Sequence, residues 1–213
     1  KDGKKNQGKV EAYDIKAVKL TQSGGRVAMN LKVDEIEAVD FGGTPRAYKE
    51  GDAAQRSGSF EEAVAKWQAV IDDAKVRDVL KQEAYWNLAQ CQFESGKGED
   101  AATSVKSLLT KFPSSRYLAK AHDLAVRGLV GAKKAEEAIA FATAEETRVN
   151  AIPDSRQITD GLKLLRAIVQ KDSGQGAQAK ADLQTLANTG GPMADKARVM
   201  LGHVLLTEKN SAE

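Results

Sequence analysis

The chain has 213 residues, of which 41% are hydrophobic, 29% are charged and 5% are aromatic, and its formal net charge is +2. This length and balance suit one large domain, or a small domain joined to a repeat array, with enough apolar material for a core. The mild charge gives no argument for a nucleic-acid partner, and no apolar run approaches the roughly 18 residues of a membrane-spanning helix.

Residues 1–43 carry the pattern of β-strands. Val10 and Ala12 lie two residues apart, as do Val18 and Leu20, which is the spacing that puts side chains on one face of a strand. We therefore expect a small antiparallel, barrel-like β domain over this region.

Turn signals and apolar residues extend this pattern. Ser23–Gly25 predicts a turn, and Ile36–Phe41 predicts a last strand. Lys1–Lys4 is typical of a hairpin tip, so we expect a segment upstream of it, with a strand or a removed targeting segment as alternatives. Four short strands leave an open barrel edge, which either a missing first strand or a partner would cover.

Charges are segregated within this region. Residues 1–32 hold eight lysines and arginines against three acidic residues, whereas residues 34–40 hold four acidic residues. Two interpretations stay open, namely the solvated outer faces of amphipathic strands or a basic face for an anionic partner.

From Thr44 onward the apolar residues follow a helical period, and a pattern repeats. Glycine is followed five residues later by a small alanine in Gly58–Ala63, in Gly96–Ala101 and in Gly174–Ala179, with larger apolar residues beyond. The glycine ends a first helix in left-handed backbone, and the alanine lets a second helix cross the first closely. A single hairpin of this kind cannot bury its apolar face, so several must stack.

This pattern resembles the tetratricopeptide repeat family, whose unit is a helical hairpin of about 34 residues. The resemblance implies a mainly α fold, an α-solenoid over residues 44–213 that follows the β domain. Its expected units are residues 44–77, 82–115, 118–152 and 160–193, with a final helix at 194–208. The third unit is irregular, because Leu124-Ala125 opens it but Gly131 comes early and Ala138 one residue late.

Two shorter stretches also resemble known proteins. The junction Lys111–Ala121 is similar to those of bacterial envelope proteins with such repeats, which implies an exported, periplasmic protein; a cytoplasmic location is the alternative. The spacing of Gly8, Val10 and Tyr13-Asp14 resembles the first motif of Sm-like or SH3-like small barrels. Ile15–Ala17 stands where RNA-binding members have an asparagine, so only the fold is carried over.

The residues offer little for catalysis. Cys91 is the only cysteine, and neither His122 nor His203 has a histidine or cysteine three or four residues away, as a helical metal site would need. Adjacent acidic pairs such as Glu61-Glu62 diverge by about 100° on a helix and cannot share a proton. We therefore expect no enzyme activity, no cofactor and no metal.

The family resemblance implies a concave groove lined by the first helices of successive units. The positions that would face this groove are Tyr48, Asp52, Gln55, Trp86, Gln90, Phe93, His122 and Val126. Trp86 and Phe93 lie seven residues apart on one helical face with Gln90 between them, which suits apolar anchoring of a peptide plus a bond to its backbone. Packing of this stripe against the β domain or a neighbouring subunit is the alternative.

Three functional hypotheses follow. The first is a non-enzymatic scaffold that binds a protein or peptide in the groove and self-associates through the groove or the β edge. The second is a nucleic-acid-binding adaptor that uses the basic N-terminal strands. The third is an accessory subunit of an enzyme complex.

Overall fold

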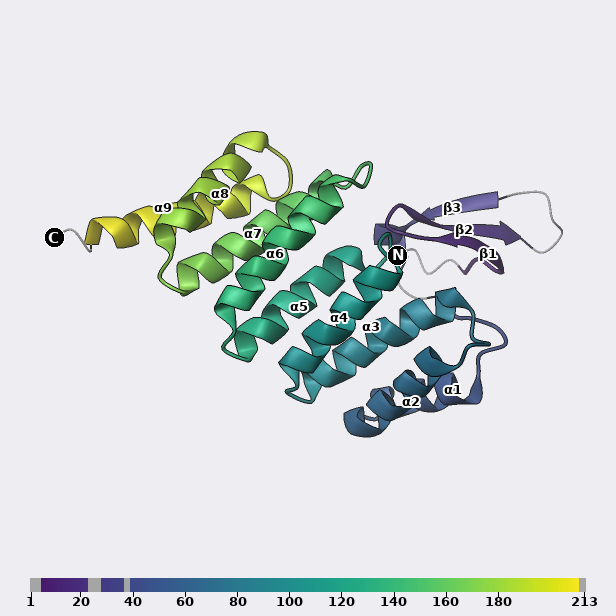
Figure 1. The fold of residues 1–213 in the computed structure, drawn as a ribbon. Coiled ribbons are helices and arrows are strands. Elements are labelled where there is room, and N and C mark those ends of the chain that lie inside the picture. The colour runs from purple at the N-terminus through teal and green to yellow at the C-terminus, as the bar shows by residue number, and fades with distance from the viewer. Residues whose placement is uncertain (1–4, 23–27, 37–38, 211–213) are drawn as a thin grey trace. The chain divides into compact units, whose positions relative to one another are not determined.

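The computed structural model describes residues 5–22, 28–36 and 39–210. Within them, a three-stranded antiparallel sheet precedes nine α-helices that pack as consecutive hairpins (Figure 1). The strands are β1 (Gly8–Tyr13), β2 (Ala17–Gln22) and β3 (Ala28–Lys32), and the 3-10 helix η1 (Val33–Glu35) follows them. The helices are α1 (Arg46–Arg56), α2 (Phe60–Asp72), α3 (Asp78–Glu94), α4 (Gly98–Lys111), α5 (Leu118–Gly131), α6 (Ala135–Asn150), α7 (Arg156–Asp172), α8 (Gly176–Thr189) and α9 (Ala194–Asn210).

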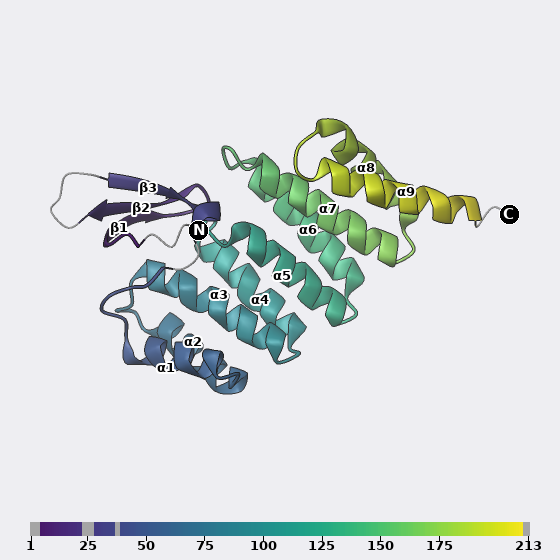
Figure 2. The same ribbon diagram turned by 180° about the vertical axis from the view of Figure 1, so that it is seen from behind.

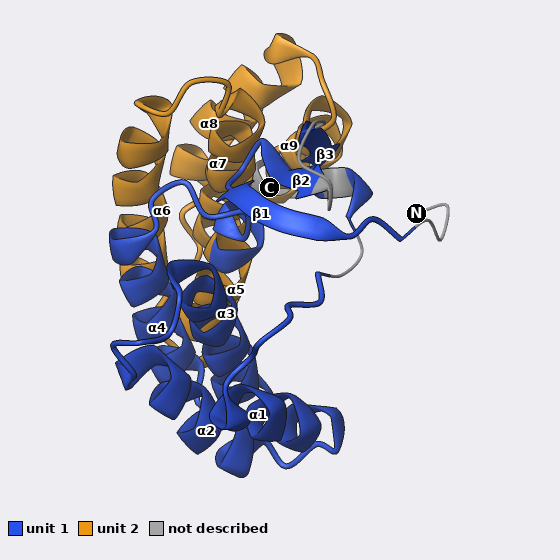
Figure 3. Ribbon diagram, turned by 90° about the vertical axis from the view of Figure 1, so that its right-hand side faces the viewer, with its two compact units in different colours: residues 1–121 blue, residues 122–213 orange. Residues whose placement is uncertain are grey.

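The chain divides into two compact units, and the boundary falls inside α5 (Figure 3). The N-terminal unit comprises residues 1–121 and the C-terminal unit residues 122–213. The sheet therefore shares a compact unit with the first four helices. The domain division at residues 43 and 44 stays a prediction.

The sheet follows the predicted alternation most closely in its central strand. The strand order is β1-β2-β3, and Val18 and Leu20 of β2 are buried. A register shift between Val10 and Ala12 interrupts the alternation in β1. Asp14 shapes the turn into β2, because its carboxylate accepts backbone hydrogen bonds from residues 16 and 17 at 2.9 and 3.2 Å.

The predicted last strand is wrong for the described part of Ile36–Phe41, since Ile36 and residues 39–41 have no strand structure. The chain turns after β3 instead, and the Ile36 amide donates to the carbonyl of Val33 at 3.4 Å within η1. The described strands thus form an open sheet and not a barrel. Residues 37–38 and the predicted turns at Lys1–Lys4 and Ser23–Gly25 lie outside the described residues.

The helices confirm the predicted hairpins. Each of the four expected repeat units corresponds to one pair, namely α1–α2, α3–α4, α5–α6 and α7–α8, and α9 is the final helix. Helices α3 and α7 each begin four residues before the start expected for their unit, at Asp78 and Arg156. In the N-terminal unit, α1 packs on α2, α2 on α3 and α3 on α4 (Figures 1 and 2). In the C-terminal unit, α6 to α9 pack on one another in the same serial order.

One closing motif ends the first helix of three hairpins. Gly58, Gly96 and Gly174 have φ angles of 77°, 77° and 78°, a backbone conformation that glycine adopts without strain. The amide after each glycine reaches back to a carbonyl five residues earlier, as in the 2.8 Å bond from Lys97 to Gln92. Five residues after each glycine an alanine is fully buried.

The third hairpin uses the same motif with a lysine in place of the glycine. Lys133 has a φ of 61°, and the next amide, of Lys134, bonds to the carbonyl of Leu129 at 2.8 Å. Ala138 follows Lys133 by five residues and is fully buried. The third hairpin therefore closes in the same way as the others, and its predicted register was one residue too early because the glycine that marks the others is missing.

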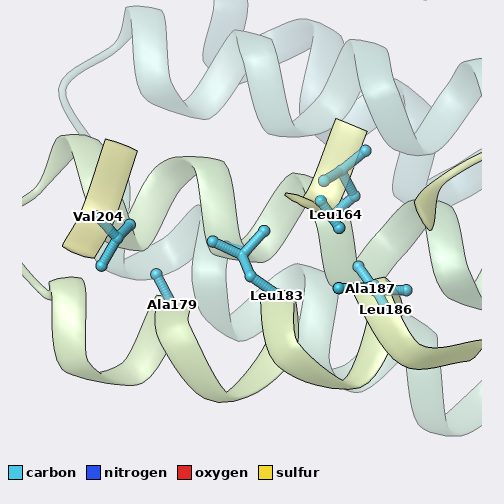
Figure 4. Close-up of a cluster of buried hydrophobic side chains, with 8 residues drawn as sticks. Leu164, Ala179, Leu183, Leu186, Ala187 and Val204 are labelled. Carbon is cyan, nitrogen blue, oxygen red and sulfur yellow. The ribbon is translucent and has the colours of Figure 1, made fainter. Parts of the chain in front are cut away.

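Small residues on the first helices admit large side chains from the second helices. A Cβ atom added to Gly51 of α1 would lie 3.1 Å from the ring of Trp67, which α2 buries completely. In the C-terminal unit, α7, α8 and α9 share a buried cluster of aliphatic side chains (Figure 4). Its members are Leu164, Ala167, Ala179, Leu183, Leu186, Ala187, Ala197 and Val204.

Replacing Lys133 with glycine should stabilise the protein. Left-handed backbone costs a residue with a Cβ about 1 kcal/mol or more, which outweighs the added flexibility of glycine in the unfolded chain. We expect Lys133→Gly to raise the free energy of unfolding by about 0.5 to 1 kcal/mol in urea denaturation followed by circular dichroism. Gly174→Ala, at the matching position of the fourth hairpin, should lower it by a similar amount. A destabilised Lys133→Gly variant would show that Lys133 does not occupy the position that glycine holds in the other hairpins.

Candidate functional site

Six of the predicted groove residues lie at the surface of the N-terminal unit. Tyr48, Asp52 and Gln55 follow one face of α1, and Trp86, Gln90 and Phe93 follow one face of α3. All six side chains are half-buried. We call these two sets the α1 stripe and the α3 stripe.

The buried indole of Trp67 on α2 orients two side chains of the α1 stripe. Tyr48 contacts Trp67 edge to face, with ring centroids 5.0 Å apart, and the indole nitrogen donates to Gln55 Oε1 at 3.0 Å. Burial is the main reason that the pKa of Tyr48 is raised. Asp52 pairs with Arg56 one turn further on, at 3.0 Å. Internal contacts thus fix the orientation of the α1 stripe.

The α3 stripe begins with a stacked aromatic pair. The ring of Trp86 lies parallel to that of Tyr117, with centroids 5.0 Å apart and an interplanar angle of 9°. Its neighbour Tyr85 points into the core, as expected for two adjacent residues on a helix. Tyr117, which lies between α4 and α5 and not in the β domain, therefore occupies one ring face of Trp86.

Arg116 continues the stack from Tyr117 to the sheet. Its guanidinium carbon lies 4.7 Å from the ring centre of Tyr117 and 5.0 Å from that of Tyr13, at the end of β1. Such cation–π contacts are favourable when the cation is shielded from water, and only 10% of the Arg116 side chain is exposed. We call Tyr13, Arg116, Tyr117 and Trp86 the aromatic stack.

A buried carboxylate lies beside the aromatic stack. Glu83 of α3 is 7% exposed and accepts a hydrogen bond from the Tyr117 hydroxyl at 2.5 Å. Its other oxygen is 3.8 Å from Nε of Arg116, too far for a hydrogen bond. Burial raises the pKa of Glu83 above its ordinary value, and the Tyr117 bond and the Arg116 charge offset this only in part.

The segment between α4 and α5, which carries Arg116 and Tyr117, also anchors the sheet. The backbone amide of Ile15 donates to the carbonyl of Ser114 at 2.9 Å, and the hydroxyls of Tyr13 and Tyr117 are 3.5 Å apart. The polypeptide between α4 and α5 thus holds both the turn after β1 and the end of the α3 stripe. The sequence flagged this junction, but not the roles of Arg116 and Tyr117. No local signal marked Glu83, because Lys81 and Gln82 before it are also polar.

The predictions for His122 and Val126 need correction, since both are buried, at 1% and 3% exposure. The register set by Lys133 moves the corresponding positions one residue on, to Asp123, Arg127 and Val130. These three side chains are half-buried or exposed. His122 and Val126 therefore belong to the interior of the C-terminal unit.

His122 has a structural role. Its Nε2 lies 2.9 Å from Glu145 of α6, and Arg148 donates to the same carboxylate oxygen at 2.6 Å. Burial lowers the pKa of His122 despite this carboxylate, which favours the neutral ring. In the same unit, Arg166 of α7 pairs with Glu146 and Asp182, both at 2.6 Å, and so ties α7 to α6 and α8.

The described residues hold no group of three or more histidine, cysteine or acidic side chains that would suit a metal ion. Cys91 is fully buried, and burial raises the pKa of its thiol to about 11, so the thiolate needed for reactivity is scarce at neutral pH. Nor does any described helix combine the length and apolarity needed to cross a membrane.

Stacked helical hairpins with a small-residue crossing define a helical-repeat protein of the α-solenoid class. Residues 48–116, which include most of α1 and all of α2, α3 and α4, match the tetratricopeptide repeat family model. This part of the chain is therefore similar to tetratricopeptide repeats. No curated protein sequence matches it significantly.

The buried Glu83 predicts a pH-dependent stability. Because its pKa is raised on folding, the folded protein holds this proton more tightly than the unfolded chain, and stability falls as the pH rises through the raised pKa. Glu83→Gln keeps the shape of the side chain and removes its ability to ionise. We expect the free energy of unfolding of the wild type, relative to Glu83→Gln, to fall as the pH rises from acidic to neutral.

Tyr117→Phe should strengthen the pH dependence of the free energy of unfolding, whereas Glu83→Gln should remove the contribution of this carboxyl group to it. The tyrosine variant removes the hydroxyl that supports the carboxylate, so the loss of stability toward neutral pH should grow, by about 1 to 3 kcal/mol. Urea denaturation at a series of pH values measures both effects. A difference between wild type and Glu83→Gln that is constant with pH would refute this role for Glu83.

Proposed function

We propose that this protein is a non-enzymatic scaffold that binds a peptide segment of a partner protein on the α1 and α3 stripes. Tetratricopeptide repeats generally mediate protein–protein interaction. The observation that carries the proposal is the α3 stripe. Around it α3 is largely buried, including Tyr85, Leu88 and Cys91, whereas Trp86, Gln90 and Phe93 keep part of their surface in solvent.

The stripe combines the groups that peptide recognition needs. Trp86 and Phe93 offer apolar area at the two ends, and the amide of Gln90 between them both donates and accepts hydrogen bonds to a peptide backbone. Stacking on Tyr117 holds the Trp86 ring in one orientation before binding. A fixed anchor loses less conformational entropy on association, which favours affinity.

The α1 stripe adds a polar contribution. Tyr48 and Gln55 are oriented by Trp67, and Asp52 lies between them with its side chain partly in solvent. An acidic group at this place favours a partner segment with a lysine or arginine. The proposed ligand is therefore a peptide with two apolar residues and a basic residue.

Peptides selected from a random display library against the folded chain would test this site. We expect Gln90→Ala and Phe93→Ala each to weaken the selected peptides about tenfold, as measured by calorimetry, because they remove central contacts. Asp52→Ala should weaken the basic peptides selectively. Phe60→Ala is the matched control, since it removes a half-buried aromatic ring from the start of α2.

Unchanged peptide affinity in the stripe variants would contradict the proposal. If Gln90→Ala and Phe93→Ala leave affinity unchanged while helical content is retained, the peptides bind elsewhere. Loss of binding in Phe60→Ala alone would move the site to α2. Trp86→Ala is a weaker probe, because it also uncovers Tyr117 and so disturbs the aromatic stack.

A further inference from the structure

Two buried polar atoms beside the aromatic stack face each other without a hydrogen bond. Oε1 of Glu83 and Nε of Arg116 have no hydrogen-bond partner in the described part of the chain, although they lie 3.8 Å apart. Buried polar groups are nearly always paired, because an unpaired one has lost its bonds to water. A carboxylate oxygen and a guanidinium nitrogen at this separation are one short side-chain movement away from a closed ion pair.

Arg116 is held in its present place by two aromatic rings. Its guanidinium lies 4.7 Å from the ring centre of Tyr117 and 5.0 Å from that of Tyr13, and it donates to the Tyr117 hydroxyl at 3.0 Å. Tyr13 ends β1, so this cation–π contact also joins the sheet to the segment between α4 and α5. The position that suits Tyr13 leaves Nε too far from Glu83 for a hydrogen bond.

We propose that the protonation state of Glu83 controls how firmly the sheet is docked. With Glu83 protonated, the guanidinium of Arg116 stays on the ring of Tyr13 and holds the sheet. When Glu83 gives its proton to solvent, the carboxylate draws Nε of Arg116 into a direct ion pair, and the contact with Tyr13 weakens. Tyr117 bonds to the other oxygen of Glu83, so its stack on Trp86 is kept in both arrangements. The proposal is therefore independent of the proposed peptide site.

The direction of the effect follows from the proton affinities of the two arrangements. Burial raises the pKa of Glu83 in the open arrangement, whereas a closed ion pair stabilises the carboxylate and lowers this pKa. The protein with the weakened sheet contact therefore binds the proton less tightly, and a rise in pH favours it. Each unit of pKa difference between the two arrangements shifts the docking equilibrium about tenfold.

The other titratable groups around the pair do not explain such a response. The groups that act on Glu83 are Tyr117 and Arg116, and Arg116 also acts on Tyr48 of α1. The pKa values of Tyr48 and Tyr117 are raised, mainly by burial, so both hydroxyls stay protonated between acidic and neutral pH. The remaining charged or titratable neighbours from the packed elements are Tyr13 of β1, Asp40 before α1, and Lys111 of α4, which lies over the ring of Tyr85.

Hydrogen exchange of the full chain, followed by nuclear magnetic resonance, tests the proposal at one amide. The amide of Ile15 bonds to the carbonyl of Ser114, so its protection factor reports docking, whereas amides between β2 and β3 report the sheet itself. We expect the protection factor of Ile15 to fall about tenfold from acidic to neutral pH, while those between β2 and β3 stay constant. Protonation of Asp14, which caps the turn after β1, would act in the opposite direction, because it weakens that turn as the pH falls.

Four variants separate this mechanism from a general loosening of the sheet. Glu83→Gln should keep Ile15 protected at every pH, and Glu94→Gln, an exposed residue on the same helix, is the matched control that should retain the wild-type profile. Tyr13→Leu should leave Ile15 poorly protected at every pH, whereas Tyr13→Phe keeps the ring and should retain the profile. A wild-type protection factor that stays constant or rises with pH, a profile that persists in Glu83→Gln, or equal profiles in the two Tyr13 variants would overturn the proposal.

Discussion

The fold depends on the close crossing of two helices at a position with almost no side chain. In all four hairpins a residue in left-handed backbone ends the first helix, and an alanine five residues later is fully buried where the second helix crosses. A larger residue at that alanine would push the helices apart and expose the apolar side chains beyond it. Gly51 and Trp67 show the complementary case, in which a missing Cβ on α1 makes room for an indole.

This constraint also determines which surfaces remain for partners. In the N-terminal unit, α3 packs on its own second helix, α4, and on the preceding helix, α2, so only a narrow strip of it reaches solvent. On α3 that strip holds Trp86, Gln90 and Phe93. The candidate binding surfaces are therefore what repeated packing leaves uncovered.

The hairpins could be predicted from the sequence because their signals are local. Glycine and alanine at a fixed spacing locate three of them, and the third was displaced by one residue because Lys133 adopts a backbone conformation that favours glycine. That error placed His122 and Val126 in the groove, although both are buried. The aromatic stack and Glu83 escaped prediction because their contacts join distant segments, and no local period reports such contacts. The bacterial envelope location and the Sm-like or SH3-like likeness stay predictions.

The contact between the sheet and the helices has a consequence for the order of folding. Tyr13 and Tyr117 are separated by 104 positions along the chain, whereas the hairpin contacts span a few tens of residues at most. Closing this long loop before the helices form would cost chain entropy, and no local contact would offset that cost. We therefore expect the hairpins to form first and the sheet to dock afterwards onto the segment between α4 and α5. In hydrogen exchange the sheet should accordingly open before the hairpins do, as a separate cooperative unit.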